Sequence, residues 1–329
     1  MPGMNRRQAI LTAGALGAAL AIPAALAQAK IPRVAIFTFG SRFNARARTE
    51  AFLKGMRELG YEDGRNVQFE WRFANGQPDL VKDIAVELSR ARIDVIVSAS
   101  TLTTDALLQA TSTIPIVMAT VEDPVISGFV KSLAHPETHV TGLTSNAIEQ
   151  VPRHMELLLK AVPSVKRVAA LVNPASAIYA AYRARVEWAA RSVRVRLVMM
   201  DATNYRDIER AFGKIQSAPV GGMLVMSDGS FYTERNTITE LAARFRVPAV
   251  YPQQGYAEAG GLMSYGQNLE YNYTRAAWYV DRILKGANPA DLPIEEPANT
   301  ELVINRNTAR SLGLALPPEL LKRAVKIIG

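Results

Sequence analysis

The 329-residue chain contains no cysteine and only three histidines. Without cysteine there can be no disulfide, thiolate nucleophile, cysteine-type zinc site or c-type haem attachment. A lipid anchor, which needs a cysteine just after an export signal, is excluded as well. His135, His139 and His154 do not stand at the spacing of metal ligands. We therefore expect no metal and no cofactor.

Common catalytic motifs are also missing. The chain has no G-x-S-x-G, no phosphate-binding G-x-x-x-x-G-K-[ST] and no G-x-G-x-x-G after a predicted strand. After residue 30, no segment approaches the roughly 18 uncharged apolar residues that a membrane span needs. These absences argue against an enzyme, and they leave a binding function as the first hypothesis.

The N-terminus has the pattern of a secretory signal peptide. Arg6 and Arg7 form a basic start, residues 9–22 are apolar and uncharged, and Pro23 interrupts the run. The triplet 27–29 (Ala-Gln-Ala) fits the small-x-small cleavage rule. We expect a signal peptide at residues 1–29 and a mature protein that is free in the periplasm, with no lipid anchor. The paired arginines fit the twin-arginine route as well as the general export route.

The formal net charge is +8, and the basic residues are spread along predicted helices rather than gathered in one block. A diffuse excess of this kind is typical of a solvated surface. We therefore do not expect nucleic acid as a partner.

Short apolar runs alternate with helical patterns through the rest of the chain. The segment "RVAIF" (33–37) reads as a buried strand, and the residues after it have helical spacing up to Gly60. Near residue 165 the pattern restarts, and "PRVAIFTFG" (32–40) is echoed by "KRVAALVNP" (166–174). Strands alternating with helices indicate βαβ units and parallel sheets covered on both faces. The sequence thus predicts an α/β protein with two similar Rossmann-like lobes.

Candidate binding residues follow the carboxyl ends of the predicted strands. In open α/β sheets, ligands bind in the crevice outside these strand ends. Small hydroxyl residues, carboxylates, an amide and aromatic residues stand there, which is the mixture that a small polar ligand needs. The candidates are Thr38, Phe39, Ser41, Ser100, Thr101, Glu122, Asp123, Asn173, Asp228 and Tyr251.

Most of the candidates also have a purely structural interpretation. Ser100 and Thr101 begin a predicted helix, where they could hold a carboxylate or only cap the helix. Asp228 could take an ammonium group or cap the next helix. The pair 122–123 (Glu-Asp) before proline could bind ligand or form a turn.

Three further candidates have equally open roles. Phe39 and Tyr251 could enclose an apolar group or pack between the lobes. Asn173 precedes a proline, which restricts it to extended backbone. Its amide could hydrogen-bond the ligand or the backbone.

Five segments together resemble a known family: "IPIVMATVEDPV", "TGLT", "VNPAS", "GGLMSYGQNLEYNYTRAAWYVDRILKGANPADLPIEEP" and "ELVINRNTARSLGL". They are similar to the ABC-transporter substrate-binding proteins of the periplasmic type I fold. Within that family they resemble the branch that binds tryptophan and other aromatic amino acids. The resemblance runs from about Arg33 to the C-terminus. Glu122 departs from the usual residue of this branch, and two adjacent acids suit a ligand with more positive charge or more hydroxyl groups.

The resemblance implies two lobes joined by three crossings, near 142–146, 260–261 and 287–292, and ligand capture by lobe closure without a cofactor. The N-terminal lobe would comprise 30–145 plus 262–288, and the C-terminal lobe 146–261 plus 289–329. It also implies a monomer that takes a small organic ligand, amino-acid-like and with aromatic ligands included, to an ABC permease in the inner membrane.

One alternative function stays open at this point. A periplasmic sensor of the same fold would present its closed state to a receptor instead of a transporter. A sugar-responsive repressor of related fold would need a helix-turn-helix head, and residues 1–29 have the pattern of a signal peptide instead.

Overall fold

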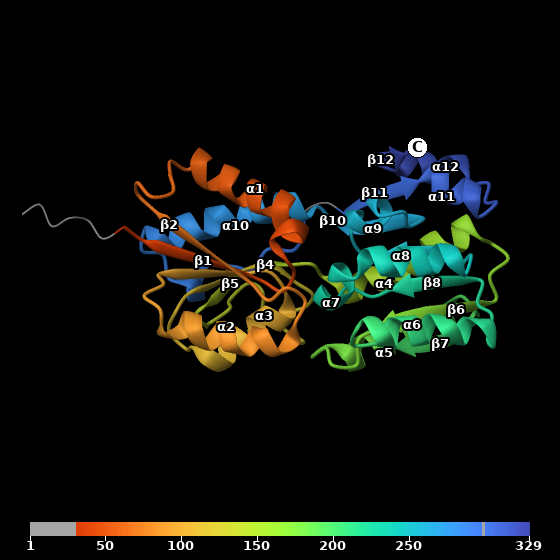
Figure 1. The fold of residues 1–329 in the computed structure, drawn as a ribbon, viewed down its shortest axis with the longest axis horizontal. Helices are drawn as coiled ribbons and strands as arrows, with labels where there is room; N and C mark the ends of the chain where they lie inside the picture. The colour runs from red at the N-terminus through yellow and green to blue at the C-terminus, as the bar shows by residue number, and fades with distance from the viewer. Residues whose placement is uncertain (1–30, 298–299) are drawn as a thin grey trace, which may run out of the picture. The chain divides into compact units, whose positions relative to one another are not determined.

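Two α/β lobes, each built around its own sheet, make up the part of the chain from Pro32 onward (Figure 1). The structure is a computed structural model that describes residues 31–297 and 300–329. The predicted signal peptide at residues 1–29 lies outside the described residues. Within the described ranges, no helix combines the length and the apolar character needed to cross a membrane.

The first lobe contains a five-stranded parallel sheet in the order β2-β1-β3-β4-β5. Its strands are β1 (Arg33–Thr38), β2 (Gln68–Phe73), β3 (Val95–Ser98), β4 (Ile116–Val121) and β5 (Val140–Thr144). Its helices are α1 (Arg42–Glu58), α2 (Pro78–Arg90), α3 (Thr101–Ala110) and α10 (Leu269–Leu284), with the 3₁₀ turn η2 (Pro289–Asp291).

Strand β1 shows how both faces of this sheet are covered. Successive side chains of a strand point to opposite faces. Val34 and Ile36 pack in the cluster formed with α1 and α10, whereas Ala35 and Phe37 pack in the cluster formed with α2 and α3. Both faces are therefore covered, as the uninterrupted apolar run predicts for a parallel sheet.

The second lobe contains a seven-stranded sheet in the order β12-β11-β10-β9-β8-β6-β7. Its strands are β6 (Arg167–Val172), β7 (Arg196–Asp201), β8 (Gly222–Val225), β9 (Ala249–Tyr251), β10 (Met263–Gln267), β11 (Thr300–Asn305) and β12 (Lys326–Ile328). Neighbouring strands are parallel except β10 and β11.

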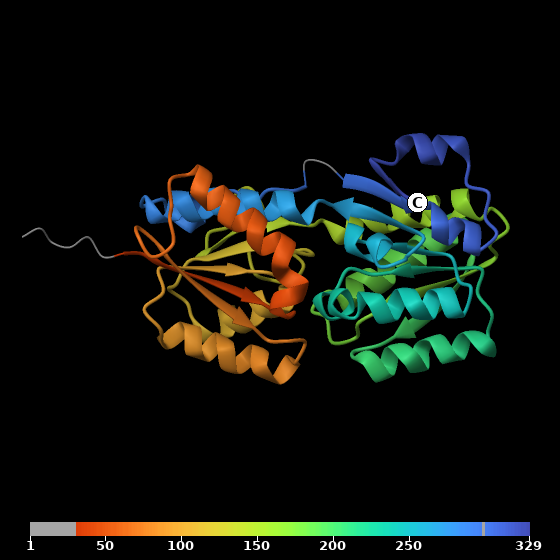
Figure 2. The ribbon, with the colours of Figure 1, turned by 45° about the horizontal axis from the view of Figure 1, so that its top comes forward.

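Helices cover both faces of the second sheet (Figure 2). They are α4 (Ala147–Ala161), α5 (Tyr179–Ser192), α6 (Tyr205–Gly213), η1 (Lys214–Gln216), α7 (Gly229–Thr233), α8 (Arg235–Arg244), α9 (Gln254–Glu258), α11 (Arg306–Ser311) and α12 (Pro318–Arg323). The order β7-β6-β8-β9 repeats the order β2-β1-β3-β4 of the first sheet. The internal repeat read from the sequence is thereby confirmed.

The chain crosses between the sheets three times, and two of the crossings differ from the prediction. The first follows β5 and leads into α4, as expected. The second lies at Asn268, between β10 and α10, and not at 260–261, because β10 pairs with both β9 and β11 of the second sheet. Residues 263–267 therefore do not belong to the first lobe as predicted.

The third crossing lies after Glu295 rather than at 287–292. Ile294 packs in the core of the first lobe, and the Glu295 N–H donates to the Gly142 carbonyl at 2.9 Å. These contacts keep residues 289–295 with the first lobe, where the prediction gave them to the second. With these two changes, the division into lobes stays our proposal.

Candidate functional site

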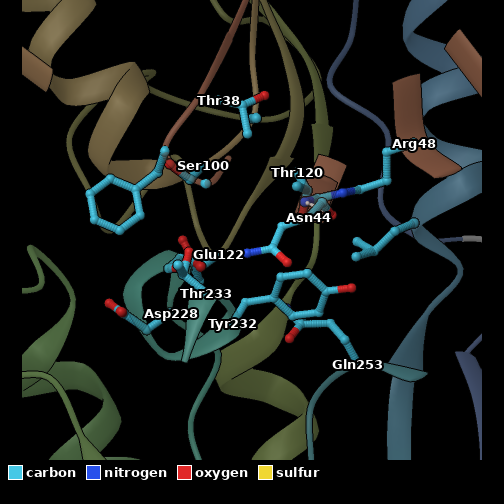
Figure 3. A pocket seen from close by; sticks show the side chains of 15 residues that line it. Thr38, Asn44, Arg48, Ser100, Thr120, Glu122, Asp228, Tyr232, Thr233 and Gln253 are labelled. Atoms are coloured by element: carbon cyan, nitrogen blue, oxygen red, sulfur yellow. Dashed lines mark hydrogen bonds between the residues drawn. The ribbon is translucent and has the colours of Figure 1, made fainter. Parts of the chain in front are cut away.

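A cavity lies between the lobes, at the carboxyl ends of the strands (Figure 3). We call it the central cavity. The first lobe contributes residues from the β1–α1 loop, α1, the start of α3 and the end of β4. The second lobe contributes α7 and the residue Gln253 after β9. Its lining comprises Thr38, Phe39, Gly40, Asn44, Arg48, Ala99, Ser100, Thr120, Glu122, Asp228, Gly229, Tyr232, Thr233, Gln253 and Leu269.

Glu122 is a buried carboxyl directly after β4. Its backbone N–H donates to the Thr101 hydroxyl oxygen at 3.2 Å, and the Thr101 hydroxyl donates to its Oε2. From the second lobe, the Ser227 hydroxyl donates to its Oε1 at 3.4 Å. Burial, helped by the negative charge of Asp228, raises the pKa of Glu122 to about 8. Much of this group is therefore protonated at neutral pH.

Asp228 caps the N-terminus of α7 and faces Glu122 from the other lobe. Its Oδ1 accepts from the backbone N–H groups of Ser230 and Phe231 at 2.8 and 3.2 Å. Its Oδ2 accepts from the Asn173 side-chain amide at 3.0 Å. Burial raises the pKa of Asp228, while these hydrogen bonds oppose the shift.

Arg48 brings a positive charge into the same cavity from α1. The residue is 9% exposed, and its guanidinium lies over the rings of Tyr232 and Tyr273, at 5.0 and 5.8 Å from their centroids. Its Nη2 donates to the Asn44 carbonyl at 3.0 Å. Among the described residues, no carboxylate forms an ion pair with Arg48. A buried cation without an anion is costly, so this position favours an anionic group from outside the protein.

Gln253 adds an acceptor that has no protein partner. Its Nε2 donates to the Ser227 hydroxyl at 3.1 Å, which leaves the buried Oε1 without a hydrogen bond. Buried polar atoms almost always have a partner, so an orphaned acceptor in a cavity indicates a missing donor. Figure 3 shows Asp228 and Glu122 on one side and Arg48 on the other, with Asn44 and Tyr232 between them. The cavity thus presents opposite charges at its two ends.

The structure brings part of the predicted set into this cavity. Thr38, Phe39, Ser100, Glu122 and Asp228 line it. Thr101 and Asn173 line a second cavity that shares Glu122 and Asp228 with the first. The binding roles of these residues stay predictions.

Three predicted residues line neither cavity. Ser41 caps α1, with its hydroxyl accepting from the Asn44 N–H at 3.3 Å. Asp123 accepts from two backbone N–H groups in its own turn, at positions 125 and 126. Tyr251 is fully buried in the core of the second lobe and stacks on Tyr256 at 4.9 Å. For Asp123 the turn interpretation given above describes the observed contacts, whereas Tyr251 packs within the second lobe and not between the lobes.

The environment of Ser100 and Thr101 also changes their expected role. Ser100 forms a capping box with Thr103, and Thr101 is bonded to Glu122. A ligand carboxylate at this helix start would lie against the Glu122 carboxyl, which disfavours the predicted arrangement.

Sequence reasoning missed the residues contributed by helices: Asn44, Arg48, Tyr232 and Thr233 from α1 and α7, together with Thr120 and Gln253 from strand ends. One signal was present for α1. Arg48 lies between Ala45 and Phe52 on the apolar face of the predicted helix, where a charged residue is unusual. The structure offers no cluster of three or more histidine, cysteine, aspartate or glutamate side chains fit to hold a metal ion within 31–297 and 300–329.

Comparisons with known proteins fit this architecture. The tyrosine-binding protein of Clostridioides difficile (strain R20291) is 24% identical over 265 residues, which cover 80% of this chain and 76% of that protein. The crystal structure of a conserved domain protein from Vibrio cholerae is 29% identical, with a TM-score of 0.85 over 91% of this chain and 100% of that one.

An ABC domain from Streptococcus pneumonia, solved in complex with L-Trp, is 22% identical and has a TM-score of 0.84, covering 90% of this chain and 99% of that one. The two-lobe α/β fold matches structures of type I periplasmic binding proteins. A family model described as "ABC transporter substrate binding protein" matches residues 33–328. The chain therefore belongs to the ABC transporter substrate-binding proteins, a family of non-enzymatic components that bind a small molecule for an ABC transporter.

Proposed function

We propose that this protein captures an amino acid, as its zwitterion, in the central cavity and delivers it to an ABC permease of the inner membrane. The observation that carries the proposal is the unpaired Arg48 at one end of a cavity whose other end holds Glu122 and Asp228. An α-amino acid carries a carboxylate and an ammonium group on one carbon. It therefore supplies an anionic group for Arg48 and a cationic group for Glu122 and Asp228.

In this proposal the ligand carboxylate lies against Arg48 and Asn44. Charge-assisted hydrogen bonds from a guanidinium to a carboxylate are among the strongest in proteins, and burial strengthens them further. Asn44 lies one helical turn before Arg48 and lines the same cavity, so its side chain is placed to contact the same group.

The ligand ammonium then lies between Glu122 and Asp228, with the orphaned Gln253 Oε1 as a further acceptor. These groups come from both lobes. An ammonium that contacts both carboxyl groups stabilises the closed arrangement more than the open one, which is how a ligand shifts such an equilibrium. Closure of this kind around a ligand is known for periplasmic binding proteins.

Two relatives support the ligand class. One is named as a tyrosine-binding protein, and another was solved with L-Trp. We place the protein in the periplasm on the pattern of its residues 1–29, and we propose that it acts as a monomer.

The test is a binding series on protein that has been unfolded and refolded to remove bound ligand. Each L-amino acid is compared with its decarboxylated amine and its deaminated acid, and sugars and polyamines complete the panel. A ligand at 100 times its Kd adds about 2.7 kcal/mol to the free energy of unfolding, which a thermal melt detects. We expect amino acids to bind, and both analogues to bind at least tenfold more weakly. Binding of a sugar or polyamine with no amino acid bound would contradict the proposal.

A further inference from the structure

A second cavity adjoins the central cavity at Glu122, Asp228 and Gly229. Both lobes line it. The first lobe contributes the beginnings of α2 and α3, and the second contributes the loop after β6, the loop after β7 and the start of α7. Because its walls come from both lobes, a group that fills this cavity contacts both of them in the closed arrangement.

The chemistry of this second cavity differs from that of the central one. Its apolar lining is aliphatic, from Pro78, Leu102, Ala175 and Ala177, and no aromatic side chain lines it. Its charged residue, besides the two shared carboxyl groups, is Asp105 on α3. Asp105 accepts a hydrogen bond from Gln109 at 2.8 Å, and no basic side chain of the described residues forms an ion pair with it.

Taken together, the two cavities hold three carboxyl groups and one guanidinium. The carboxyl groups are Glu122, Asp228 and Asp105, and the guanidinium is Arg48. Arg48 is itself nine-tenths buried without an anion, which independently indicates a ligand at this place. One carboxylate of a ligand satisfies Arg48, and its ammonium satisfies the shared pair. Asp105 then remains as an acceptor for a second positive group.

The spacing suits one molecule that reaches all of these groups. Thr101, which is bonded to Glu122, lies one helical turn before Asp105 on α3. Four residues correspond to a rise of about 6 Å along the helix axis. A flexible stem of three or four methylene groups spans such a distance and packs well on aliphatic walls, as the stems of lysine and arginine do.

From this arrangement, and resting on the proposed function, we propose that the ligand is a basic α-amino acid. Its α-ammonium stays between Glu122 and Asp228, its side chain extends past Gly229, which lines both cavities, along Leu102 and Ala175, and its terminal ammonium or guanidinium lies at Asp105. This assignment differs from the aromatic ligands named for the two relatives, and the lack of aromatic residues in the second cavity is the reason.

The experiment compares basic amino acids with neutral analogues by calorimetry on ligand-free protein. L-lysine is paired with L-norleucine, which lacks only the terminal ammonium, and L-arginine with L-citrulline, which has the same shape. L-tyrosine and L-tryptophan represent the aromatic class. We expect each basic ligand to bind at least tenfold more tightly than its neutral partner. Asp105→Asn should reduce this ratio to about one and leave the affinity for norleucine and citrulline within threefold.

The matched control is Asp83→Asn, an exposed aspartate of α2 that lines neither cavity; it should keep the full preference. Tighter binding of tyrosine or tryptophan, or an equal loss for basic and neutral ligands in Asp105→Asn, would overturn the assignment while leaving the amino-acid function intact. If no amino acid binds to the unmodified protein, both proposals are wrong.

Discussion

Arg48 is the residue on which the binding proposal depends most directly. Its guanidinium is buried against two tyrosine rings and has a carbonyl, but no carboxylate, within bonding distance. In the ligand-free protein this charge is stabilised only in part. The energy that an incoming carboxylate gains there is therefore available for binding and is not spent on breaking an existing ion pair.

We expect Arg48→Met to weaken amino-acid binding at least 30-fold and to leave the free energy of unfolding unchanged or higher. Removing one partner of a buried charge pair costs about 2–5 kcal/mol, because the other charge stays unpaired. The measurement is the Kd by calorimetry together with a urea unfolding curve. The control is Arg46→Met on the same helix, which removes an exposed ion pair with Glu50. A Kd within threefold of the unmodified protein in Arg48→Met would contradict this role.

The raised pKa of Glu122 leads us to expect that ligand binding depends on pH. Its pKa of about 8 without ligand means that the group is protonated below that pH. A ligand ammonium favours the ionised carboxylate, so binding below pH 8 releases protons. We expect the affinity to increase from pH 6 to pH 8 and then to level off. Calorimetry in buffers of different ionisation enthalpy measures the protons released, and Glu122→Gln should abolish most of the release.

The raised pKa of Glu122 also determines how the free energy of unfolding changes with pH. The folded pKa of Glu122 lies above the unfolded value of 4.5, so the folded protein binds more protons between about pH 4.5 and 8. The contribution of Glu122 to the free energy of unfolding therefore falls as the pH rises through this interval. For the binding experiment described above, the contradicting outcome is an equal number of protons released on ligand binding by Glu122→Gln and by the unmodified protein, which would show that another group titrates.

Residue positions at strand ends were predictable, but the directions of their side chains were only partly so. Glu122 and Asp228 follow short buried strands, and the sequence places them at the correct edge. Tyr251 also ends a strand, yet its ring packs inside the second lobe. Which way a residue at a strand end points depends on the pleat and on the helix that covers it, and neither is visible in a single apolar run.

At the scale of elements, strand β5 runs so close to β4 that it requires glycine. Gly142 has φ of +122°, and a Cβ atom there would lie 2.2 Å from the Met118 carbonyl oxygen. We expect Gly142→Ala to lower the free energy of unfolding by about 3 kcal/mol or more, since backbone must move to relieve the overlap. Urea unfolding of the two proteins measures the difference.

Gly128 offers a matched control for the backbone conformation alone. Its φ is +76°, and nothing lies within 4 Å of the position of a Cβ atom. Gly128→Ala should therefore lower the free energy of unfolding only by the cost of a positive φ for alanine, about 1 kcal/mol. Equal losses in the two variants would mean that the approach of β5 to β4 has no energetic importance.

The order of strands could be inferred from the repeated pattern, whereas the crossings between lobes could not. The echo of "PRVAIFTFG" in "KRVAALVNP" correctly indicates two sheets with one topology. Strand β10 was assigned to the wrong lobe because glycine-flanked segments can end a strand in either sheet. Its pairing with β11, more than thirty residues later, places β10 in the second sheet. No local pattern in the sequence indicates a pairing between segments so far apart.

At the scale of the whole molecule, few polar contacts hold the two lobes together over the cavity. Ser227 reaches Glu122 at 3.4 Å in the interior, and Arg235 of α8 donates to the Asn44 side-chain oxygen at 3.2 Å. Arg235 also lies over the ring of Tyr232, with its guanidinium carbon 4.9 Å from the centroid. The Gln267 side-chain amide also donates to the Thr120 hydroxyl at 2.7 Å. Contacts of this kind are worth about 1 kcal/mol each, so we expect ligand contacts to add substantially to the stability of the closed arrangement.

Arg235 therefore acts on closure and not on ligand contact, since it does not line the central cavity. We expect Arg235→Ala to raise the Kd about three- to tenfold, mainly through faster dissociation, because only the closed form loses the contact with Asn44. Stopped-flow fluorescence separates the two rate constants, and small-angle scattering follows closure. Arg244→Ala, at the exposed end of the same helix, should change neither. A change confined to the association rate would show that Arg235 attracts the ligand, whereas faster dissociation with an unaltered saturated state identifies it as part of the closing contact.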